Sequence, residues 1–279
     1  MRFRVLLLLI LGHLIGDFIL QFKYILNKRF SNNKIDVLFG NLIHSLIHLA
    51  LVFVFLLFYL LLDSFFEISR YLKTCVLLVF FHFCIDTIKS FLVLRYPSFD
   101  NNIFIFILDQ VAHIIVIVLV LFKFDINDIL TKASIFIDAY PSNINIFDKY
   151  LIISIIVLLT TCVTGIFIKK FINYVLFKNA TTFINRGNII VKSNDNITGI
   201  NNGGYIIGIL ERIIILLGMA IMQPGIAGFV LTTKSIARFK KLDNNSFVEY
   251  FIIGTFLSFI SAIIGGIIIY SLNIIPVIK

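Results

Sequence analysis

Long apolar runs separated by short polar segments extend along the whole chain. We interpret eight of them as membrane helices, at 3–22, 36–62, 72–94, 101–123, 149–168, 204–222, 225–238 and 248–274. A helix needs about 20 mainly apolar residues to cross a bilayer. The seventh run is shorter and follows Gln223-Pro224-Gly225, a pattern that also fits a re-entrant segment. The pattern predicts an all-α, polytopic integral membrane helical bundle with about seven or eight transmembrane helices.

The polar segments between the runs divide the chain into three parts. Residues 1–124 hold four closely spaced runs and form a four-helix membrane half. Residues 125–148 are of mixed polarity and are expected to form an extramembrane loop with an interfacial helix. Residues 149–279 form a second membrane half, which is interrupted by a polar, Asn- and Gly-rich loop at 178–204.

Composition excludes a water-soluble protein and sets the orientation. The chain is 59% hydrophobic and its mean hydropathy is +1.03. The net charge of +9 does not point to nucleic acid, because Lys and Arg collect in the cytoplasmic loops of membrane proteins. We therefore expect a bacterial cytoplasmic (inner) membrane protein whose partner is membrane lipid and which binds no nucleic acid. The loop charges place the N-terminus outside.

All five histidines lie in the first four runs, each with a metal-capable partner four residues away. Residues four apart share one helix face, with side chains about 5–6 Å apart. Counted inward from the loops at about 1.5 Å per residue, these groups lie about 14–20 Å deep in a core of about 30 Å. They are therefore expected to form a single layer, with Asp17 slightly shallower. The pairs are His13–Asp17, His44–His48, His82–Asp86 and Asp109–His113.

Energy favours a bound cation in this layer. Each unpaired aspartate at mid-membrane costs about 2.5–3.5 kcal/mol on insertion scales. A divalent ion offsets that cost, and imidazole with carboxylate suits Zn, Fe or Mn better than Cu(I) or Ca. Eight ligands fit two ions with a bridging carboxylate, or one ion whose histidines are oriented by aspartates. Asp17, Asp86 and Asp109 are then the candidates for a catalytic base or orienting group.

The alternative is a buried polar network with no metal. In that case His–Asp hydrogen bonds join the helices, and Lys89, one turn after Asp86, supplies the counter-charge. Ionisable groups are rare inside membranes, and four pairs at one depth are hard to attribute to chance. The repeated spacing therefore favours a metal.

A second polar cluster occurs in the second half. Glu211-Arg212 interrupts the sixth run, and Lys234 and Arg238 share one face of the seventh. Arg212, Lys234 and Arg238 are candidates for holding an anionic head group. Equally, Glu211 is a candidate charge partner that pairs with Lys234 or Arg238 and only fastens the helices. Both interpretations stay open.

At these residues the chain resembles a family of bacterial multi-pass membrane proteins catalogued as domain of unknown function 3307. In the first half, the resemblance rests on Gly12-His13-Leu-Ile-Gly16-Asp17, His82-Phe-Cys-Ile-Asp86-Thr-Ile-Lys89 and Asp109-Gln110-Val-Ala-His113. In the second half it rests on Ile207-Gly208-Ile-Leu-Glu211-Arg212, Lys234-Ser235-Ile-Ala-Arg238-Phe239 and Glu249-Tyr250. Thr233 departs mildly from the family's usual Ala. The resemblance implies the same topology but no reaction.

Three functions remain. The first is a membrane-embedded metal-dependent hydrolase whose metal activates water against a lipid or amphiphilic anionic substrate. The second is a divalent metal-ion transporter, although eight ligands hold an ion tightly while conduction requires release. The third is a non-enzymatic stress or defence component in which the network is structural. No nucleophile or phosphate-loop motif appears in the sequence.

Overall fold

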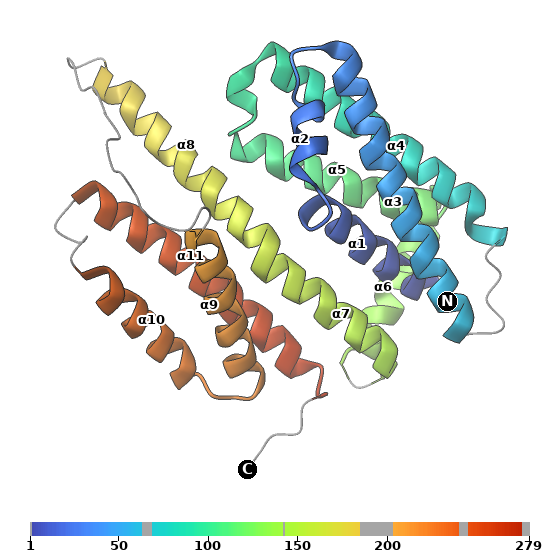
Figure 1. The fold of residues 1–279 in the computed structure, drawn as a ribbon. Helices are drawn as coiled ribbons and strands as arrows, with labels where there is room; N and C mark the ends of the chain where they lie inside the picture. The colour runs from blue at the N-terminus through green and yellow to red at the C-terminus, as the bar shows by residue number, and fades with distance from the viewer. Residues whose placement is uncertain (1, 63–68, 142, 185–202, 240–244, 275–279) are drawn as a thin grey trace. The chain divides into compact units, whose positions relative to one another are not determined.

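The computed structural model describes residues 2–62, 69–141, 143–184, 203–239 and 245–274, and every regular element among them is helical (Figure 1). A 3-10 turn, η1, covers Pro97–Phe99, and a π-helical turn, η2, covers Leu159–Val163. The α-helices are α1 (Arg2–Phe18), α2 (Lys23–Arg29), α3 (Lys34–Leu62), α4 (Ser69–Arg95), α5 (Ile103–Leu121), α6 (Ile126–Ala139), α7 (Ile146–Leu158), α8 (Thr164–Ile184), α9 (Gly203–Ala220), α10 (Gly225–Arg238) and α11 (Asn245–Ser271).

Six helical segments of the described chain are long and apolar enough to cross a membrane, and a seventh is added if α1 and α2 count as one bent span. The predicted all-α polytopic fold is therefore confirmed. The seventh run, 225–238, is the exception: α10 has 14 residues and extends only about 21 Å at 1.5 Å per residue. That length is short of a hydrocarbon core of about 30 Å.

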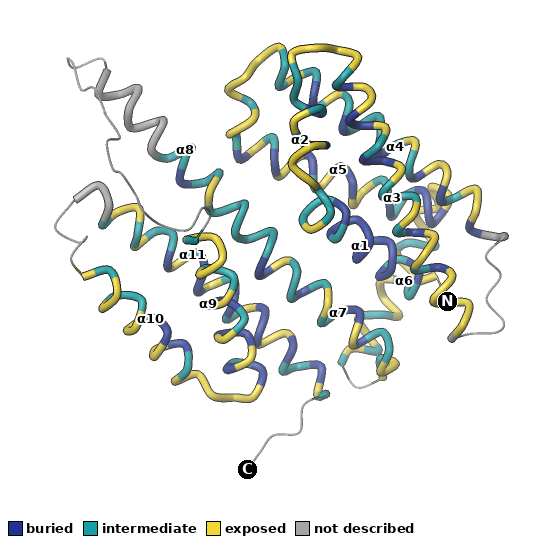
Figure 2. Tube along the Cα trace, viewed as in Figure 1, coloured by how far each residue is buried: buried dark blue, intermediate teal, exposed yellow. Residues whose placement is uncertain are grey.

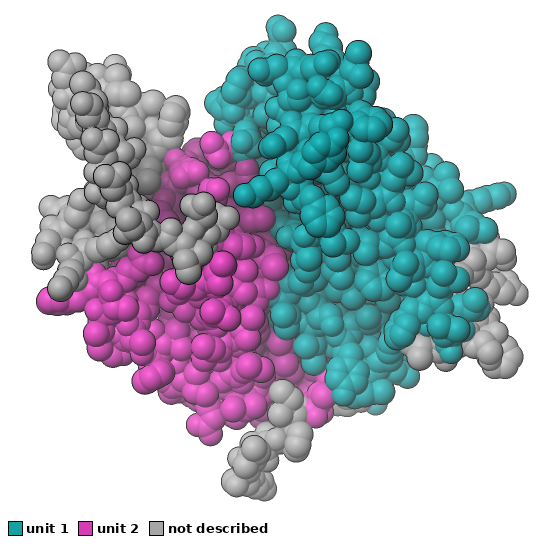
Figure 3. Space-filling view, in the orientation of Figure 1, with its two compact units in different colours: residues 1–100, 104–158 teal, residues 101–103, 159–279 magenta. Residues whose placement is uncertain are grey.

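The chain divides into two units, 1–100 with 104–158, and 101–103 with 159–279 (Figure 3). In unit 1 the central element is α1, which contacts α3 and α7. Its residues Val5, Leu8 and Leu9 are buried in one core with Leu56 of α3 and Val120 of α5. A helix that is apolar all round is buried, either against other helices or in lipid. The burial along α1 follows from that rule (Figure 2).

The first predicted span, 3–22, is wrong in its boundary. Helix α1 ends at Phe18, and α2 begins at Lys23 at an angle of 86° to it. Helix α2 then packs against α3. Gly40 of α3 makes this approach possible, because a Cβ there would lie 2.7 Å from the backbone nitrogen of Arg29.

Ion pairs fasten the opposite end of α1. Arg2 pairs with Asp128 of α6, and Arg4 Nε donates to Asp148 Oδ1 of α7 at 2.6 Å. Helix α6 occupies the segment for which an interfacial helix was predicted. Its N-cap is Asp125, whose carboxylate accepts a hydrogen bond from the backbone of Asp128 at 3.1 Å. The two cations at this end of α1 are therefore neutralised within unit 1.

Unit 2 is built around the contact between α9 and α11, with α10 packed on α9 and α8 on α11. Its core contains Ile215, Val230, Phe259 and Ala262. The predicted polar loop 178–204 begins later than expected, because α8 continues to Ile184 and α9 starts at Gly203. Residues 185–202 of that loop lie outside the described residues.

Candidate metal centre

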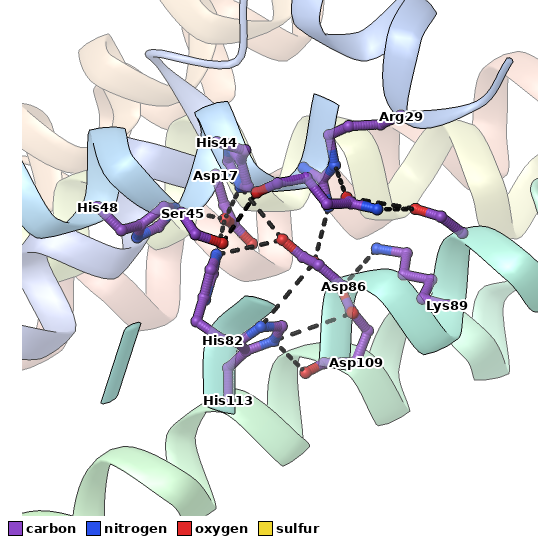
Figure 4. Close-up of polar contacts among 12 residues, drawn as sticks. Asp17, Arg29, His44, Ser45, His48, His82, Asp86, Lys89, Asp109 and His113 are labelled. Atoms are coloured by element: carbon purple, nitrogen blue, oxygen red, sulfur yellow. Dashed lines mark hydrogen bonds and ion pairs between the residues drawn. The ribbon is translucent and has the colours of Figure 1, made fainter. Parts of the chain in front are cut away.

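Four helices of unit 1 bring the four predicted pairs together. Helix α1 carries His13 and Asp17, and the other pairs lie on α3, α4 and α5. All five histidines are buried, with exposed fractions between 0% and 7%. Because each pair is spaced by four residues, both members face the same interior line, and the side chains meet in one cluster (Figure 4).

Asp17 lies at the centre of one group of ligands. Its Oδ1 lies 3.1 Å from His44 Nε2, 3.1 Å from His48 Nε2 and 3.9 Å from His82 Nε2. The same carboxylate lies 3.9 Å from His13 Nε2 through Oδ2. It therefore connects α1 to α3 and α4 through imidazole nitrogens. None of the ion pairs among the described residues joins Asp17 to a Lys or an Arg.

Asp86 is held differently, between two histidines and a cation. Its Oδ2 lies 3.2 Å from His82 Nε2 and 3.5 Å from His44 Nε2. Its Oδ1 accepts an ion pair from Arg29 Nη2 at 2.7 Å, and His113 Nε2 lies 4.0 Å from the same atom. Both charged partners are buried, with side-chain exposures of 2% and 1%. Asp86 is therefore an oriented carboxylate whose charge is already matched.

Asp109 also has its own cation. Lys89 Nζ donates to Asp109 Oδ2 at 2.6 Å, and Gln110 Nε2 donates to the same oxygen at 3.1 Å. Gln110 Nε2 also reaches Asp17 Oδ2 at 3.3 Å. One turn further on α5, His113 Nδ1 donates to the backbone carbonyl of Asp109 at 2.8 Å, so that Nε2 is the nitrogen that could bind an ion.

Several buried polar atoms of the cluster lack a hydrogen-bond partner in the described part of the chain. They belong to side chains from all four helices, and the short contact between His82 and Asp86 does not have hydrogen-bond geometry. An unmade hydrogen bond on a buried group costs about 1–3 kcal/mol, so several at one place call for another ligand. The atoms are His13 Nε2, His44 Nδ1, His82 Nε2, His113 Nε2, Asp86 Oδ2 and Asp109 Oδ1.

The spacing of these atoms fits coordination of an ion. Asp17, His44, His48 and His82 each offer one ligand atom within 4.8 Å of the others, and His82, Asp86 and His113 do the same. Bonds of about 2.0–2.1 Å in a tetrahedral zinc site place neighbouring ligand atoms about 3.3 Å apart. The distances of 3.1, 3.1 and 3.9 Å around Asp17 Oδ1 bracket that value. Since the two groups share His82, they favour one ion over two.

The charges of the cluster also favour one ion over two. The layer contains three carboxylates, of which Asp86 and Asp109 are paired with Arg29 and Lys89. One net negative charge remains, on Asp17, and the histidines are uncharged when they ligate. A single divalent ion would largely offset that charge, whereas two divalent ions would leave a larger excess of positive charge, which is costly to bury.

The sequence missed one buried cation and assigned another to the wrong partner. Arg29 falls in the polar segment between the first two predicted runs, where a solvent-exposed loop charge is expected, but it is 2% exposed and bonds Asp86 and, through Nε, Asn41 Oδ1 at 2.8 Å. Asn41 Nδ2 continues the network to Ser90 Oγ at 3.1 Å. Lys89, predicted as the counter-charge of Asp86, pairs with Asp109 instead. The long-range return of α2 has no local signal in the sequence.

In unit 2, the residues predicted to bind an anionic head group contact different partners within the protein. Lys234 Nζ lies 2.5 Å from Glu211 Oε2, the pairing that a purely structural role requires. Arg212 is 3% exposed and donates to Ser258 Oγ at 3.1 Å and to the Thr161 carbonyl at 2.8 Å. Arg238 lies in the last turn of α10. Two of the three cations are thus engaged by side chains or backbone of unit 2 itself.

The fold and the cluster together define a polytopic membrane protein with a buried histidine–aspartate centre in its first unit. Residues 5–140 match the family described as "Protein of unknown function (DUF3307)", as the resemblance predicted. The matched region contains all eight candidate ligands, together with Arg29 and Lys89. The second-half elements that resemble the family lie beyond it. No curated protein and no solved structure matches the chain.

Proposed function

We propose that unit 1 is a membrane-embedded metal centre that binds one divalent ion, Zn, Fe or Mn, and activates a water molecule in the manner of metal-dependent hydrolases. The observation that supports this most is the group of Asp17, His44, His48 and His82, whose ligand atoms lie within 4.8 Å of one another. A bound divalent ion lowers the pKa of its water towards neutrality and polarises a nearby bond.

The aspartates then take different roles. Asp17 is the ligand, because it alone of the three has imidazole nitrogens as its near neighbours and no paired cation. Asp86 is fixed by Arg29 2.7 Å away and orients His82, as carboxylates commonly orient ligand histidines. Asp109 is held by Lys89 and belongs to neither group of close ligand atoms.

The fixed carboxylates favour a resident ion over a transported one. Conduction requires ligands that release the ion easily. Here two aspartates are held in place by buried or half-buried cations, and the histidines come from four packed helices. The anionic lipid substrate has less support, because Lys234 is already paired with Glu211 and Arg212 with Ser258.

We place the protein in the bacterial cytoplasmic membrane with its N-terminus outside. The end of unit 1 that carries α2 has Lys23, Lys28 and Lys34, whereas Arg2 and Arg4 at the opposite end are paired with acids. An excess of cations marks the cytoplasmic side of membrane proteins. Cysteine labelling of Lys23→Cys from the two sides of spheroplasts tests this orientation, and labelling from outside contradicts it.

Elemental analysis of the purified protein tests the metal centre. We expect about one divalent ion per chain in the wild type, because the ligand set suffices for one. His82→Ala removes the histidine that both ligand groups share and should lose most of the metal. Asp36→Ala, in the first turn of α3 and outside both groups, is the matched control and should keep it.

Asp109→Ala separates a ligand from a supporting residue. Asp109 belongs to neither group of close ligand atoms, so its removal should weaken metal binding less than the loss of His82. A metal-free wild type, or equal metal in the wild type and His82→Ala, contradicts the proposal. In that case the cluster is a structural hydrogen-bond network.

A further inference from the structure

A small cavity lies directly against the histidines of unit 1. Its volume is ≈ 40 Å³, and His13, His48, His82 and His113 form one part of its wall. The other six lining residues are aliphatic, among them Leu9 of α1, Val52 of α3 and Leu78 of α4. The histidine–aspartate cluster thus has a largely apolar cavity on one side.

The lining contains imidazoles but no charged side chain. Asp17, Asp86 and Asp109 are absent from the wall, as are Arg29 and Lys89. Three of the histidines that do line it, His13, His82 and His113, have a buried Nε2 without a hydrogen-bond partner among the described residues. The polar groups that line the cavity are therefore imidazoles of the histidine–aspartate cluster, and His48, His82 and His113 among them belong to the groups of close ligand atoms.

The volume limits what fits. A single water needs about 10–15 Å³ by this kind of measure, so ≈ 40 Å³ accepts one to a few small molecules. Pockets that take drug-sized ligands measure about 300–1,000 Å³. An acyl chain is far too large, and an anionic head group would meet aliphatic walls without a cation, where an unpaired charge is costly.

We propose that this cavity is the ligand pocket of the metal centre and that it takes a small uncharged molecule, water or a diatomic molecule, at the ion's open position. The inference rests on the proposed metal centre and narrows its substrate class. Lipid acyl chains and head groups are excluded from the ion, and the aliphatic residues of the wall set the size limit. Val116 of α5 lines the cavity, whereas Val120, one turn further along the same helix, does not.

The test uses full-length protein loaded with Fe(II) in detergent and two uncharged probes of different size. Nitric oxide has two atoms and gives ferrous sites an electron paramagnetic resonance signal, while imidazole at pH 8 is a neutral five-membered ring. We expect nitric oxide to bind the wild type and give the signal, and we expect added imidazole to leave that nitric oxide signal undiminished, because the ring cannot compete for the position. Iron content is measured on every sample, so that loss of metal is separated from loss of the pocket.

Two substitutions on α5 provide a matched pair. Val116→Phe fills the cavity and should weaken nitric oxide binding about tenfold or more at unchanged iron content, because a packed core does not yield to added volume. Val120→Phe adds the same volume outside the lining and should bind nitric oxide like the wild type. Leu78→Ala enlarges the cavity and should admit imidazole, which tests the pocket even if the phenylalanine variants fail to fold.

The outcomes separate the two proposals. Equal weakening of nitric oxide binding in Val116→Phe and Val120→Phe, with iron retained, overturns the pocket and leaves the metal centre intact. Binding of imidazole to the wild type as tightly as nitric oxide also overturns the size limit. If neither native metal nor iron is held by the wild type, while His82→Ala behaves identically, the metal centre itself is wrong and the pocket with it.

Discussion

The two units bury charged groups in opposite ways. Unit 1 gathers three carboxylates and five imidazoles around one point and leaves six of their atoms without a hydrogen-bond partner in the described chain. Unit 2 buries a cation, Arg212, and gives two of its nitrogens a hydroxyl and a carbonyl, while Glu211 and Lys234 neutralise each other. One cluster is incomplete without a further ligand, and the other is largely complete.

This difference indicates where function lies. Buried polar atoms cost free energy when unpartnered, and a fold retains them when something else binds there. In unit 2 the polar groups hold helices together, since Arg212 links α9 to α11 and to the π-helical turn η2. Substitutions in the polar cluster of unit 2 should therefore change stability alone, whereas those in the histidine–aspartate cluster of unit 1 should change both stability and metal content.

The largest expected effect is that of Arg29→Met. It leaves the 1%-exposed Asp86 carboxylate without its cation, and breaking a buried ion pair costs about 3–5 kcal/mol. Unfolding in detergent measures this loss, and Lys23→Met at the start of the same helix is the control. Adding Asp86→Asn should recover much of the stability, because the uncompensated charge is then gone. An equal loss in Lys23→Met would show that α2 docks without this pair.

A second prediction compares two glycines one turn apart on α1. A Cβ at Gly16 would lie 2.4–2.9 Å from ring atoms of His48, whereas one at Gly12 would lie 3.3 Å from Phe55. Gly16→Ala should displace His48 and weaken metal binding about tenfold or more, the range seen when ligand orientation is lost. Gly12→Ala should retain the metal. Metal titration checks both, and indistinguishable affinities would exclude His48 from the ligand set.

Much of the candidate site could be predicted from the sequence because helix geometry is local. Spacings of four residues put both members of a pair on one helix face, so the gathering of the eight candidate residues of unit 1 in one cluster follows from the pattern. The partner of each aspartate does not follow, because it depends on contacts across helices. Lys89 is three residues from Asp86 yet bonds Asp109. Asp86 pairs instead with Arg29 of α2, a helix that lies at 86° to α1.

The fold shows the same limit. Apolar runs predicted most of the long helices to within a few residues, although α8 continues past 168 to Ile184. The break after Phe18 and the π-helical turn at Leu159–Val163 depend on tertiary contacts. Gly40, on α3, is related to the first, since it admits the backbone of Arg29. The Thr161 carbonyl that accepts from Arg212 belongs to the second. Neither contact is encoded in hydrophobic periodicity.

Arg212→Met tests the structural role of the cluster in unit 2. The substitution removes hydrogen bonds from a charged donor to Ser258 and to the Thr161 carbonyl, each worth about 1.5–3 kcal/mol, partly offset by relief of the buried charge. We expect a net destabilisation of about 1–2 kcal/mol with unchanged metal content. Arg238→Met, at the end of α10, should have little effect. A loss of metal in Arg212→Met would contradict the division of roles between the units.

The smallest effect is expected for the Glu211–Lys234 pair, which is partly exposed, with side-chain exposures of 17% for Lys234 and 12% for Glu211. A double-mutant cycle with Glu211→Gln and Lys234→Met should give a coupling of about 0.6–1.7 kcal/mol, the range of polar contacts between membrane helices. If the pair instead held an anionic ligand, Lys234→Met alone would abolish binding of anionic lipid vesicles and the coupling would vanish. A positive coupling with unchanged vesicle binding assigns the pair to helix packing, because two charges that neutralise each other leave none for a ligand.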